Sequence, residues 1–310
     1  MGRYRPYLIG SGLGLLYGVL SRLIGGSVPF FLFSCAFILL VPLVMGYLAV
    51  RSLTGAVWWE KIWVSWIPWL LAVGIAWAIG AEGAICILLA TPMALLTSTI
   101  GGFLAPTELG QSRQTLPILI VLPAIVAPIE NRIELAPDVR TVRNEIEIAA
   151  PPEIVWEHVR EVRTISHAEH GDSFFNVIGF PRPLQAKLVG SGVGAVRQAS
   201  FEGGVLFLEN VTAWQDRERL AFDIHANTRD IPATTLDPHV VVGSRYFDVL
   251  DGEYRLEEAR PGVTRVLLMS HHRLTTTLAP YAHLWSDAIL SSVQERILRV
   301  IRSRCESAGP

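Results

Sequence analysis

The first 130 residues of this 310-residue chain carry very little charge. Only ten of its 28 acidic and 26 basic side chains precede Asn131, and the other 44 fall within the last 180 residues. A soluble domain keeps charged groups on its surface, so this scarcity excludes an ordinary water-soluble globule for the front half. A hydrocarbon layer, in contrast, demands helical runs of roughly 20 apolar residues with few charges. We therefore predict a membrane-embedded half, residues 1–130, followed by a soluble half, residues 131–310.

Cysteines and clustered basic residues are also scarce. The three cysteines, Cys35, Cys86 and Cys305, offer neither a disulfide framework nor a metal-spaced pair. The net charge of −2 comes without a basic patch, so nucleic acid is not expected as a partner. The front half has no paired acids, histidine relay or arginine ladder within its apolar runs. This absence argues against pumping, proton-coupled transport and voltage sensing.

Signatures of covalent and cofactor chemistry are missing as well. The sequence contains no Gly-x-Ser-x-Gly elbow, and no Cys–His pair suggests nucleophilic catalysis. Gly190, Gly192 and Gly194 lie between predicted strands, whereas a dinucleotide fingerprint needs a helix directly after its glycines. The three glycines therefore favour a hairpin turn. No cofactor is predicted, and a binding protein is favoured over an enzyme.

Five apolar runs fill the front half. We predict helical spans over residues 7–26, 28–50, 62–80, 83–105 and 115–129. The last run has about 15 residues and contains three prolines, which leaves the number of membrane spans at four or five. Gly10, Gly14 and Gly18 recur every four residues and predict a small-residue face for close helix packing. Five tryptophans between residues 58 and 69 predict an interfacial aromatic belt.

Basic residues at the ends of these runs predict the membrane topology. They flank alternate connections, namely Arg3 and Arg5, then Arg51 and Lys61, then Arg113. The positive-inside rule then places the N-terminus in the cytoplasm of a bacterial-type inner membrane. Five spans put the soluble half outside the cytoplasm, and four keep it inside. We favour five, because an exposed run as apolar as residues 115–129 would be costly in water.

The rear half begins with a strand and a helix. Apolar and charged residues alternate from 142 to 148, which predicts a strand with one wet face. Pro151 and Pro152 end this strand and open a helix that carries valines at helical spacing as far as Val162. Six more strands are predicted over residues 185–189, 195–201, 205–214, 219–226, 245–257 and 264–275.

A long helix over residues 280–304 closes the chain. Its apolar stripe includes Leu284 and Ile301, whereas Arg296 is expected to face solvent. Before it, residues 227–244 form a long connection with two prolines, which is where we expect the mouth of any cavity.

Several short motifs follow one another in this half. They are Glu145-Ile-Glu-Ile-Ala-Ala-Pro-Pro-Glu-Ile-Val-Trp156, Gly192-Val-Gly-Ala-Val-Arg197 leading to Phe201-Glu-Gly203, Glu209-Asn-Val-Thr-Ala-Trp214 and the amphipathic last helix. In this order, over about residues 140–305, they resemble the helix-grip fold of the SRPBCC superfamily, which includes START, Bet v 1 and polyketide cyclase-like proteins. The resemblance implies an α+β domain in which a curved antiparallel sheet wraps around the last helix and leaves a cavity for a hydrophobic ligand. It implies no single chemistry, and it does not extend to the all-α membrane half.

Six side chains are candidates for ligand binding in such a cavity. They are Arg197, Glu209, Trp214, His225, His271 and Trp285. A buried carboxylate opposite an arginine can orient a ligand or act as a general acid–base. For Arg197 and Glu209 we favour the simpler interpretation, an ion pair on the wet face of the sheet. His271 and His272 are adjacent in a strand, so at most one of them faces the cavity.

A weak metal motif lies between the first helix and the next strand. His167, His170 and Asp172 are three possible ligands within six residues. Metal sites also need convergent geometry and supporting hydrogen bonds, so we favour a polar surface loop and predict no metal.

Three functional hypotheses follow. The first is a membrane-anchored protein that binds or shuttles a hydrophobic or lipid-like small molecule, with the lipid bilayer and that molecule as its partners. The second is a cyclase- or aromatase-like enzyme, which predicts an ionisable pair facing the cavity with a perturbed pKa. The third is an interaction or stress-response module with a vestigial cavity, which predicts that Trp156, Trp214 and Trp285 pack solidly into the core.

Overall fold

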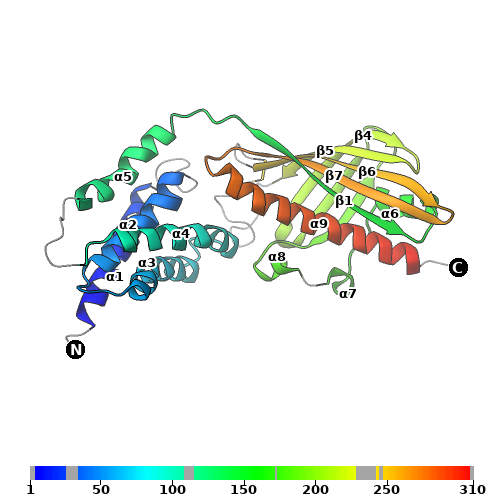
Figure 1. Ribbon diagram of the computed structural model, residues 1–310. Coiled ribbons are helices and arrows are strands. Elements are labelled where there is room, and N and C mark those ends of the chain that lie inside the picture. Colours follow the sequence, from blue (N-terminus) through cyan, green and yellow to red (C-terminus); the bar gives the residue numbers. More distant parts are fainter. Residues whose placement is uncertain are drawn as a thin grey trace. The chain divides into compact units, whose positions relative to one another are not determined.

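The computed structural model describes residues 4–25, 34–107, 115–171, 173–227, 242–243 and 247–307. The chain divides into two compact units. One comprises Met1–Leu135 with Thr276–Leu278, and the other comprises Ala136–Thr275 with Ala279–Pro310. The first unit is helical and the second contains a single large sheet (Figure 1). We describe each unit separately.

Each predicted apolar run contains a helix in the first unit. The helices are α1 (Arg5–Gly25), the π-helical turn η2 (Ala36–Leu40) with α2 (Val41–Arg51), α3 (Trp58–Ala78), α4 (Ala84–Leu104) and α5 (Thr115–Glu130). Helices α1, α3 and α4 have 21 residues each and are long and apolar enough to cross a membrane. Ala36–Arg51 and α5 are shorter apolar helices. Residues 28–33 of the second predicted span lie outside the described part of the chain, so the number of spans stays a prediction.

Glycines allow the helices of the first unit to pack very closely. A Cβ atom on Gly10 of α1 would lie 2.2 Å from the carbonyl oxygen of Ala49 in α2, and one on Gly14 would lie 2.6 Å from that of Met45. These distances are far below van der Waals contact, so only glycine fits. The small-residue face predicted for α1 is confirmed, and α2 packs against it.

Most of the large side chains on α1, α3 and α4 point outward and are apolar. Among the five clustered tryptophans, the first three are exposed. Trp66 and Trp69 instead donate hydrogen bonds from Nε1 to the hydroxyls of Thr99 and Thr91 on α4, at 2.8 and 3.3 Å. Only the three outward rings are therefore available for the predicted aromatic belt, which stays a prediction, because the other two rings join α3 to α4.

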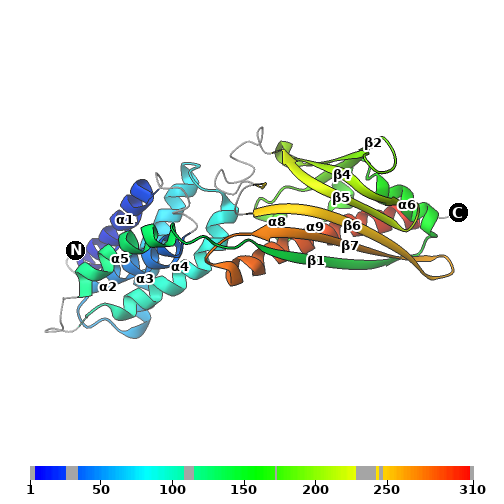
Figure 2. The same cartoon turned by 90° about the horizontal axis from the view of Figure 1, so that it is seen from above.

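The second unit is a curled antiparallel sheet with a long helix on its inner face (Figures 1 and 2). Its strands are β1 (Asp138–Ile148), β2 (Pro183–Val189), β3 (Val196–Phe201), β4 (Leu206–Gln215), β5 (Arg219–Asn227), β6 (Phe247–Arg260) and β7 (Val263–Leu274). Their order in space is β1-β7-β6-β5-β4-β3-β2. Its helices are α6 (Pro152–Arg160), the short α7 (His167–His170) and α8 (Phe174–Val177), and α9 (Ala279–Ser307). All seven predicted strands are present, and the arrangement is that of a helix grip.

Polar side chains attach α9 to the edge strand β1 and to its neighbour β7. Arg140 on β1 makes an ion pair with Asp287 on α9 at 2.7 Å. Asn144 on β1 donates to the Gln294 side chain at 2.8 Å, and Gln294 donates to Ser270 on β7 at 2.7 Å. Because these partners are directional, they fix how α9 is rotated against the sheet.

Two predictions for α9 were wrong. Leu284 is 69% exposed, and Arg296 is buried with Nη1 donating to the carbonyl oxygen of Gly171 at 3.1 Å. The apolar stripe predicted from the sequence accounts only for the side of α9 that faces the sheet. The segment that carries α7 and α8 covers a second side, and Arg296 lies beneath it.

Candidate functional site

Alternation along the strands decides which side chains face α9. On β3, Arg197 and Ala199 are buried while Gln198 between them is exposed. On β5, Phe222 is buried and Asp223 is exposed. Successive side chains of a strand point to opposite faces, so one residue in two lines the inner surface of the curl.

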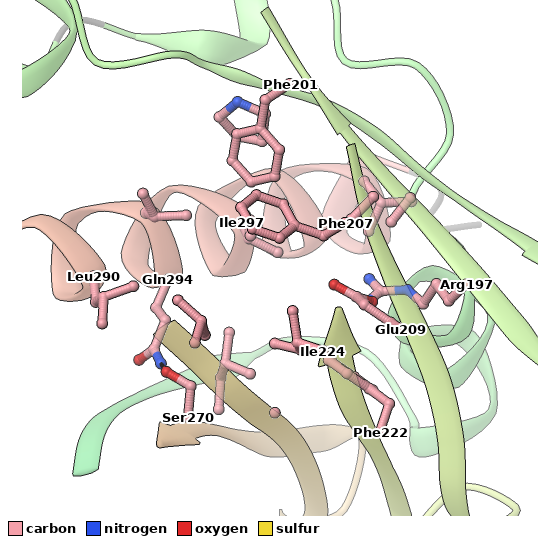
Figure 3. A pocket seen from close by; sticks show the side chains of 18 of the residues that line it. Arg197, Phe201, Phe207, Glu209, Phe222, Ile224, Ser270, Leu290, Gln294 and Ile297 are labelled. Atoms are coloured by element: carbon pink, nitrogen blue, oxygen red, sulfur yellow. Dashed lines mark hydrogen bonds and ion pairs between the residues drawn. The ribbon is translucent and has the colours of Figure 1, made fainter. Parts of the chain in front are cut away.

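The inner face of the sheet and α9 together line a partly open cavity of about 140 Å³ (Figure 3). Most of its lining is aliphatic or aromatic. The strands and loops contribute Val162, Ile165, Phe180, Pro183, Gln185, Ala186, Arg197, Ala199, Phe201, Phe207, Glu209, Phe222, Ile224, Val249, Gly252, Tyr254, Leu268 and Ser270, and α9 contributes Leu290, Val293, Gln294 and Ile297. A concave, mostly apolar space with a few polar groups is typical of a small-molecule site.

Gly252 gives the ring of Phe222 its place in this lining. A Cβ atom on Gly252 would lie 2.6 Å from that ring. The ring therefore lies close to the backbone of β6, in space that a side chain at position 252 would occupy. A larger residue at position 252 would displace it.

An ion pair forms the polar end of the cavity. Arg197 on β3 and Glu209 on β4 are directly opposed in the antiparallel register. Arg197 Nη1 donates to Glu209 Oε2 at 2.6 Å, and the two side chains are only 3% and 10% exposed. The guanidinium also lies over the rings of Phe222 and Tyr254, with Cζ 5.4 and 5.5 Å from the ring centroids. Cation–π contacts of this kind stabilise a desolvated arginine.

The pair lies on the opposite face of the sheet from the one we predicted. The wet face was expected because charged residues are rarely buried, and this expectation was wrong. Position 197 shares its side with the buried Ala199, and position 209 shares its side with the buried Val211. The backbone therefore turns both charges inward, and each charge is neutralised by the other.

Burial raises the pKa of the Glu209 carboxyl above its usual range, and the positive charge of Arg197 works against that rise. Burial acts most strongly, to lower the pKa of Arg197, but Glu209 and Tyr254 together outweigh burial, and the pKa is raised. A proton on Glu209 would leave the guanidinium alone in an apolar cavity. The charged pair is therefore the stable form at neutral pH.

A second polar group lies across the cavity, where Gln294 meets Ser270 (Figure 3). Gln294 Oε1 accepts from Asn144, and its Nε2 donates to Ser270 and, at 3.4 Å, to the carbonyl oxygen of Val142. This amide is fully used in holding α9 against the sheet. It contributes polarity to the lining but has no spare donor.

Of the six candidate ligand-binding residues, only Arg197 and Glu209 line the cavity. His225 is exposed on β5, one residue out of phase with the inward-facing Ile224. His271 faces outward on β7, where its Nδ1 lies 2.6 Å from Asp251 Oδ1. As expected, its neighbour His272 takes the other face and is fully buried.

Both candidate tryptophans lie outside the cavity lining. Trp214 packs edge-on against Trp156 with ring centroids 5.4 Å apart, and it donates to Asp216 at 2.5 Å. It belongs to the core beyond the ion pair. Trp285 is half-buried on α9 and packs edge-on against Tyr281.

The weak metal motif lies largely outside the described part of the chain. His167 and His170 are the first and last residues of α7, and Asp172 lies outside the described residues. Within the described residues, no group of three or more histidine, cysteine, aspartate or glutamate side chains is placed to hold a metal ion. Most of the connection over residues 227–244, the expected cavity mouth, also lies outside the described residues.

Sequence reasoning missed most of the residues that line the cavity. Phe201, Phe207 and Phe222 share their side of the strands with Arg197 and Glu209. Extending the alternation from the two charged positions would have found these rings. The contribution of Gln294 was missed because a polar residue on the inner side of α9 breaks the expected apolar stripe.

Comparison with known proteins shows likeness only among solved structures. No family model matches the chain, and no curated protein matches it. A protein from Nitrosospira multiformis is 21% identical, with a TM-score of 0.34, over 55% of this chain and 100% of that one. Ara h 8.0201 is 14% identical, with a TM-score of 0.34, over 55% of this chain and 99% of that one. Norcoclaurine synthase from Thalictrum flavum is 11% identical, with a TM-score of 0.34, over 56% of this chain and 90% of that one. Likeness at this level says nothing about ligand or activity.

Proposed function

We propose that the protein is a membrane-anchored binding protein for a small apolar molecule. The cavity between α9 and the inner face of the sheet is the observation that carries this proposal. Its lining is mostly apolar, and such a lining favours an apolar occupant. The ion pair of Arg197 and Glu209 at one end of the cavity orients this occupant.

The size of the cavity limits its occupant. Sites for drug-sized ligands measure roughly 300–1,000 Å³, whereas an apolar cavity of about 150 Å³ is known to take up benzene. At about 140 Å³, this cavity is matched to one ring or a short branched chain. A whole lipid requires α9 or the sheet to move.

The apolar surface of the first unit supports membrane anchoring. Leu8 and Ile24 on α1 are each 73% exposed, and Trp77 on α3 is 65% exposed. Soluble proteins rarely leave so many large apolar groups in water, whereas a bilayer accommodates them at no cost. With the N-terminus in the cytoplasm, an odd number of spans places the cavity outside, and we retain that topology as part of the proposal.

The binding proposal is tested on the full chain purified in mild detergent. Native mass spectrometry after gentle detergent release, with organic extraction of the same sample, is expected to show a co-purified molecule of low mass. The matched control is Ala199→Leu, which extends a buried lining residue into the space and is expected to empty it. A wild-type protein that is always empty and takes up no apolar probe would overturn the proposal.

An enzyme remains the second candidate, because Glu209 faces the cavity and its pKa is raised. Apart from Arg197, Glu209 and Tyr254, the described lining contains no residue that titrates. A proton transferred in a reaction there would have to pass through Glu209 or Tyr254. Glu209→Gln or Tyr254→Phe would then abolish turnover of a bound molecule, whereas a binding protein has no turnover to lose.

The third hypothesis, a module with a vestigial cavity, receives less support. Trp156 and Trp214 do pack into the core, as that hypothesis requires. They do so beyond the ion pair, however, and leave the cavity unfilled.

A further inference from the structure

The polar end of the cavity has hydrogen-bonding capacity that the protein does not use. Glu209 Oε2 accepts from Arg197, but Oε1 accepts no hydrogen bond from any residue that the structure describes. The buried Nε of Arg197 likewise has no partner among those residues. Figure 3 shows the Glu209 carboxylate directed into the space between Phe207 and Ile224. Buried polar atoms are normally satisfied, so an occupant is expected to complete this pair.

The occupant's charge follows from the balance of the pair. Arg197 and Glu209 carry one positive and one negative charge, so the lining has no net charge to offset an ionised ligand. A carboxylate or an ammonium group would enter an aromatic cavity without a counter-ion, which is strongly unfavourable. A neutral group that donates to Oε1 avoids this penalty. A hydroxyl group fits best, since it donates one hydrogen bond and can accept another from the guanidinium.

We infer that the cavity binds an uncharged, ring-sized apolar molecule that carries one hydroxyl group, which donates to Glu209 Oε1. This inference rests on the proposed function and narrows it to a ligand class. The rings of Phe201, Phe207 and Phe222 contact the apolar body of the molecule, and α9 closes the space over it with Val293 and Ile297. The ion pair therefore orients the ligand, and the aromatic lining limits its size.

The test compares probes of the same size that differ at one group. Binding of 4-fluorophenol, 4-fluorotoluene, 4-fluorobenzoate and 4-fluorobenzylamine to the full chain in lipid nanodiscs is measured by ¹⁹F NMR. Partitioning into the lipid is subtracted with Ala199→Leu in identical nanodiscs. The same two neutral probes are then measured on the double variant Arg197→Met with Glu209→Leu. That variant removes both charges together and so leaves no unpaired ion.

The ratio of the two neutral dissociation constants is the decisive quantity, because the hydration of the probes cancels between protein variants. We expect the preference for 4-fluorophenol over 4-fluorotoluene to fall by about tenfold or more in the double variant, as for loss of a charge-assisted hydrogen bond. Both charged probes are expected to bind the wild type at least about tenfold more weakly than 4-fluorophenol.

Other results distinguish failure of the hydroxyl inference from failure of the proposed function. If the ratio of the dissociation constants of 4-fluorophenol and 4-fluorotoluene is the same in the wild type and the double variant, the inference of a hydroxyl group fails, and the proposal that the cavity binds an apolar molecule is retained. Tighter binding of either charged probe also overturns the inference. If no probe binds beyond the Ala199→Leu background, the inference and the proposed function both fail.

Discussion

The buried pair of Arg197 and Glu209 makes a sharp prediction about stability. Arg197→Met and Glu209→Leu are each expected to destabilise the second unit strongly, whereas the double variant is expected to be close to the wild type. Methionine is suited to position 197 because its flexible thioether can keep contact with the rings of Phe222 and Tyr254. The three variants and the wild type form a double-mutant cycle.

The magnitude follows from the burial of the pair. Two charges about 4 Å apart attract by about 4 kcal/mol at an effective dielectric constant near 20. Removing one partner leaves the other desolvated, which typically costs about 3–5 kcal/mol. Domains are stable by only about 5–15 kcal/mol, so each single variant loses a large share of that stability. Replacing both charges with apolar groups is typically neutral or stabilising by about 1–4 kcal/mol.

The two single variants are expected to differ in their pH dependence. In Arg197→Met, nothing opposes the effect of burial on Glu209, so its folded pKa lies further above the unfolded value. The folded state then binds more protons, and the variant regains stability as the pH falls toward the unfolded pKa. In Glu209→Leu the unpaired guanidinium stays charged, so the loss persists across the same pH range.

Cys305 provides the assay. Its side chain is 1% exposed in the core of the second unit, and burial raises the pKa of its thiol to about 11. Alkylation of this thiol in increasing urea, resolved by peptide mass spectrometry, therefore reports the free energy of unfolding of this unit within the full chain. Cys35 and Cys86 lie in the first unit and are read from separate peptides.

A matched control uses an exposed pair of the same residue types. Arg143 and Glu145 on β1 are 61% and 59% exposed and lie 3.8 Å apart, so Glu145→Leu should leave Cys305 protection nearly unchanged. The reasoning is refuted if Glu209→Leu is as stable as Glu145→Leu. It is equally refuted if the double variant loses as much stability as the sum of its singles.

Three further predictions concern other parts of the chain. Gly101→Leu would place a Cβ 1.9 Å from the Leu43 carbonyl oxygen, so it should lower the melting temperature of the helical unit by several degrees. Gly74 has open space around it, so Gly74→Leu should leave the melting temperature unchanged, and thermal unfolding in detergent checks both variants. Hydrogen bonds from Arg304 lower the pKa of Glu169 to about 2. Its contribution, at most about 3 kcal/mol, should be present above the unfolded pKa and lost as the pH falls toward 2, and Glu169→Gln should flatten that acid limb in Cys305 alkylation. A protease site added after residue 310 should be cleaved when protease is added to spheroplasts, in which the outer membrane is open, and protection until lysis of the inner membrane would contradict an odd number of spans.

The order of elements in the second unit could be predicted because its signals are local. Alternation over 142–148, two prolines, the glycine-rich turns and the periodicity of the last helix each reflect the backbone preferences of neighbouring residues. All seven strands and the helix α9 lie where these signals place them, within a few residues. The second face of α9 could not be predicted, since Arg296 is covered by a segment more than a hundred residues earlier in the chain.

In the candidate site, the pairing of Arg197 with Glu209 could be predicted from the sequence, but the face of the sheet that the pair occupies could not. Arg197 lies six residues before Gly203 and Glu209 six residues after it, so a hairpin centred on Gly203 puts the two charges directly opposite. Which face they occupy depends on α9, whose packing is not encoded near either residue. Trp214 shows a further limit. A bulge between Val211 and Ala213 shifts the alternation by one residue, so Trp214 pairs with the buried Leu220 and turns inward to Trp156. Without the bulge, its side would be that of Thr212, which is exposed. Strand alternation therefore locates a cavity lining reliably only between irregularities of the sheet, and Arg197 and Glu209 both lie in such a regular stretch.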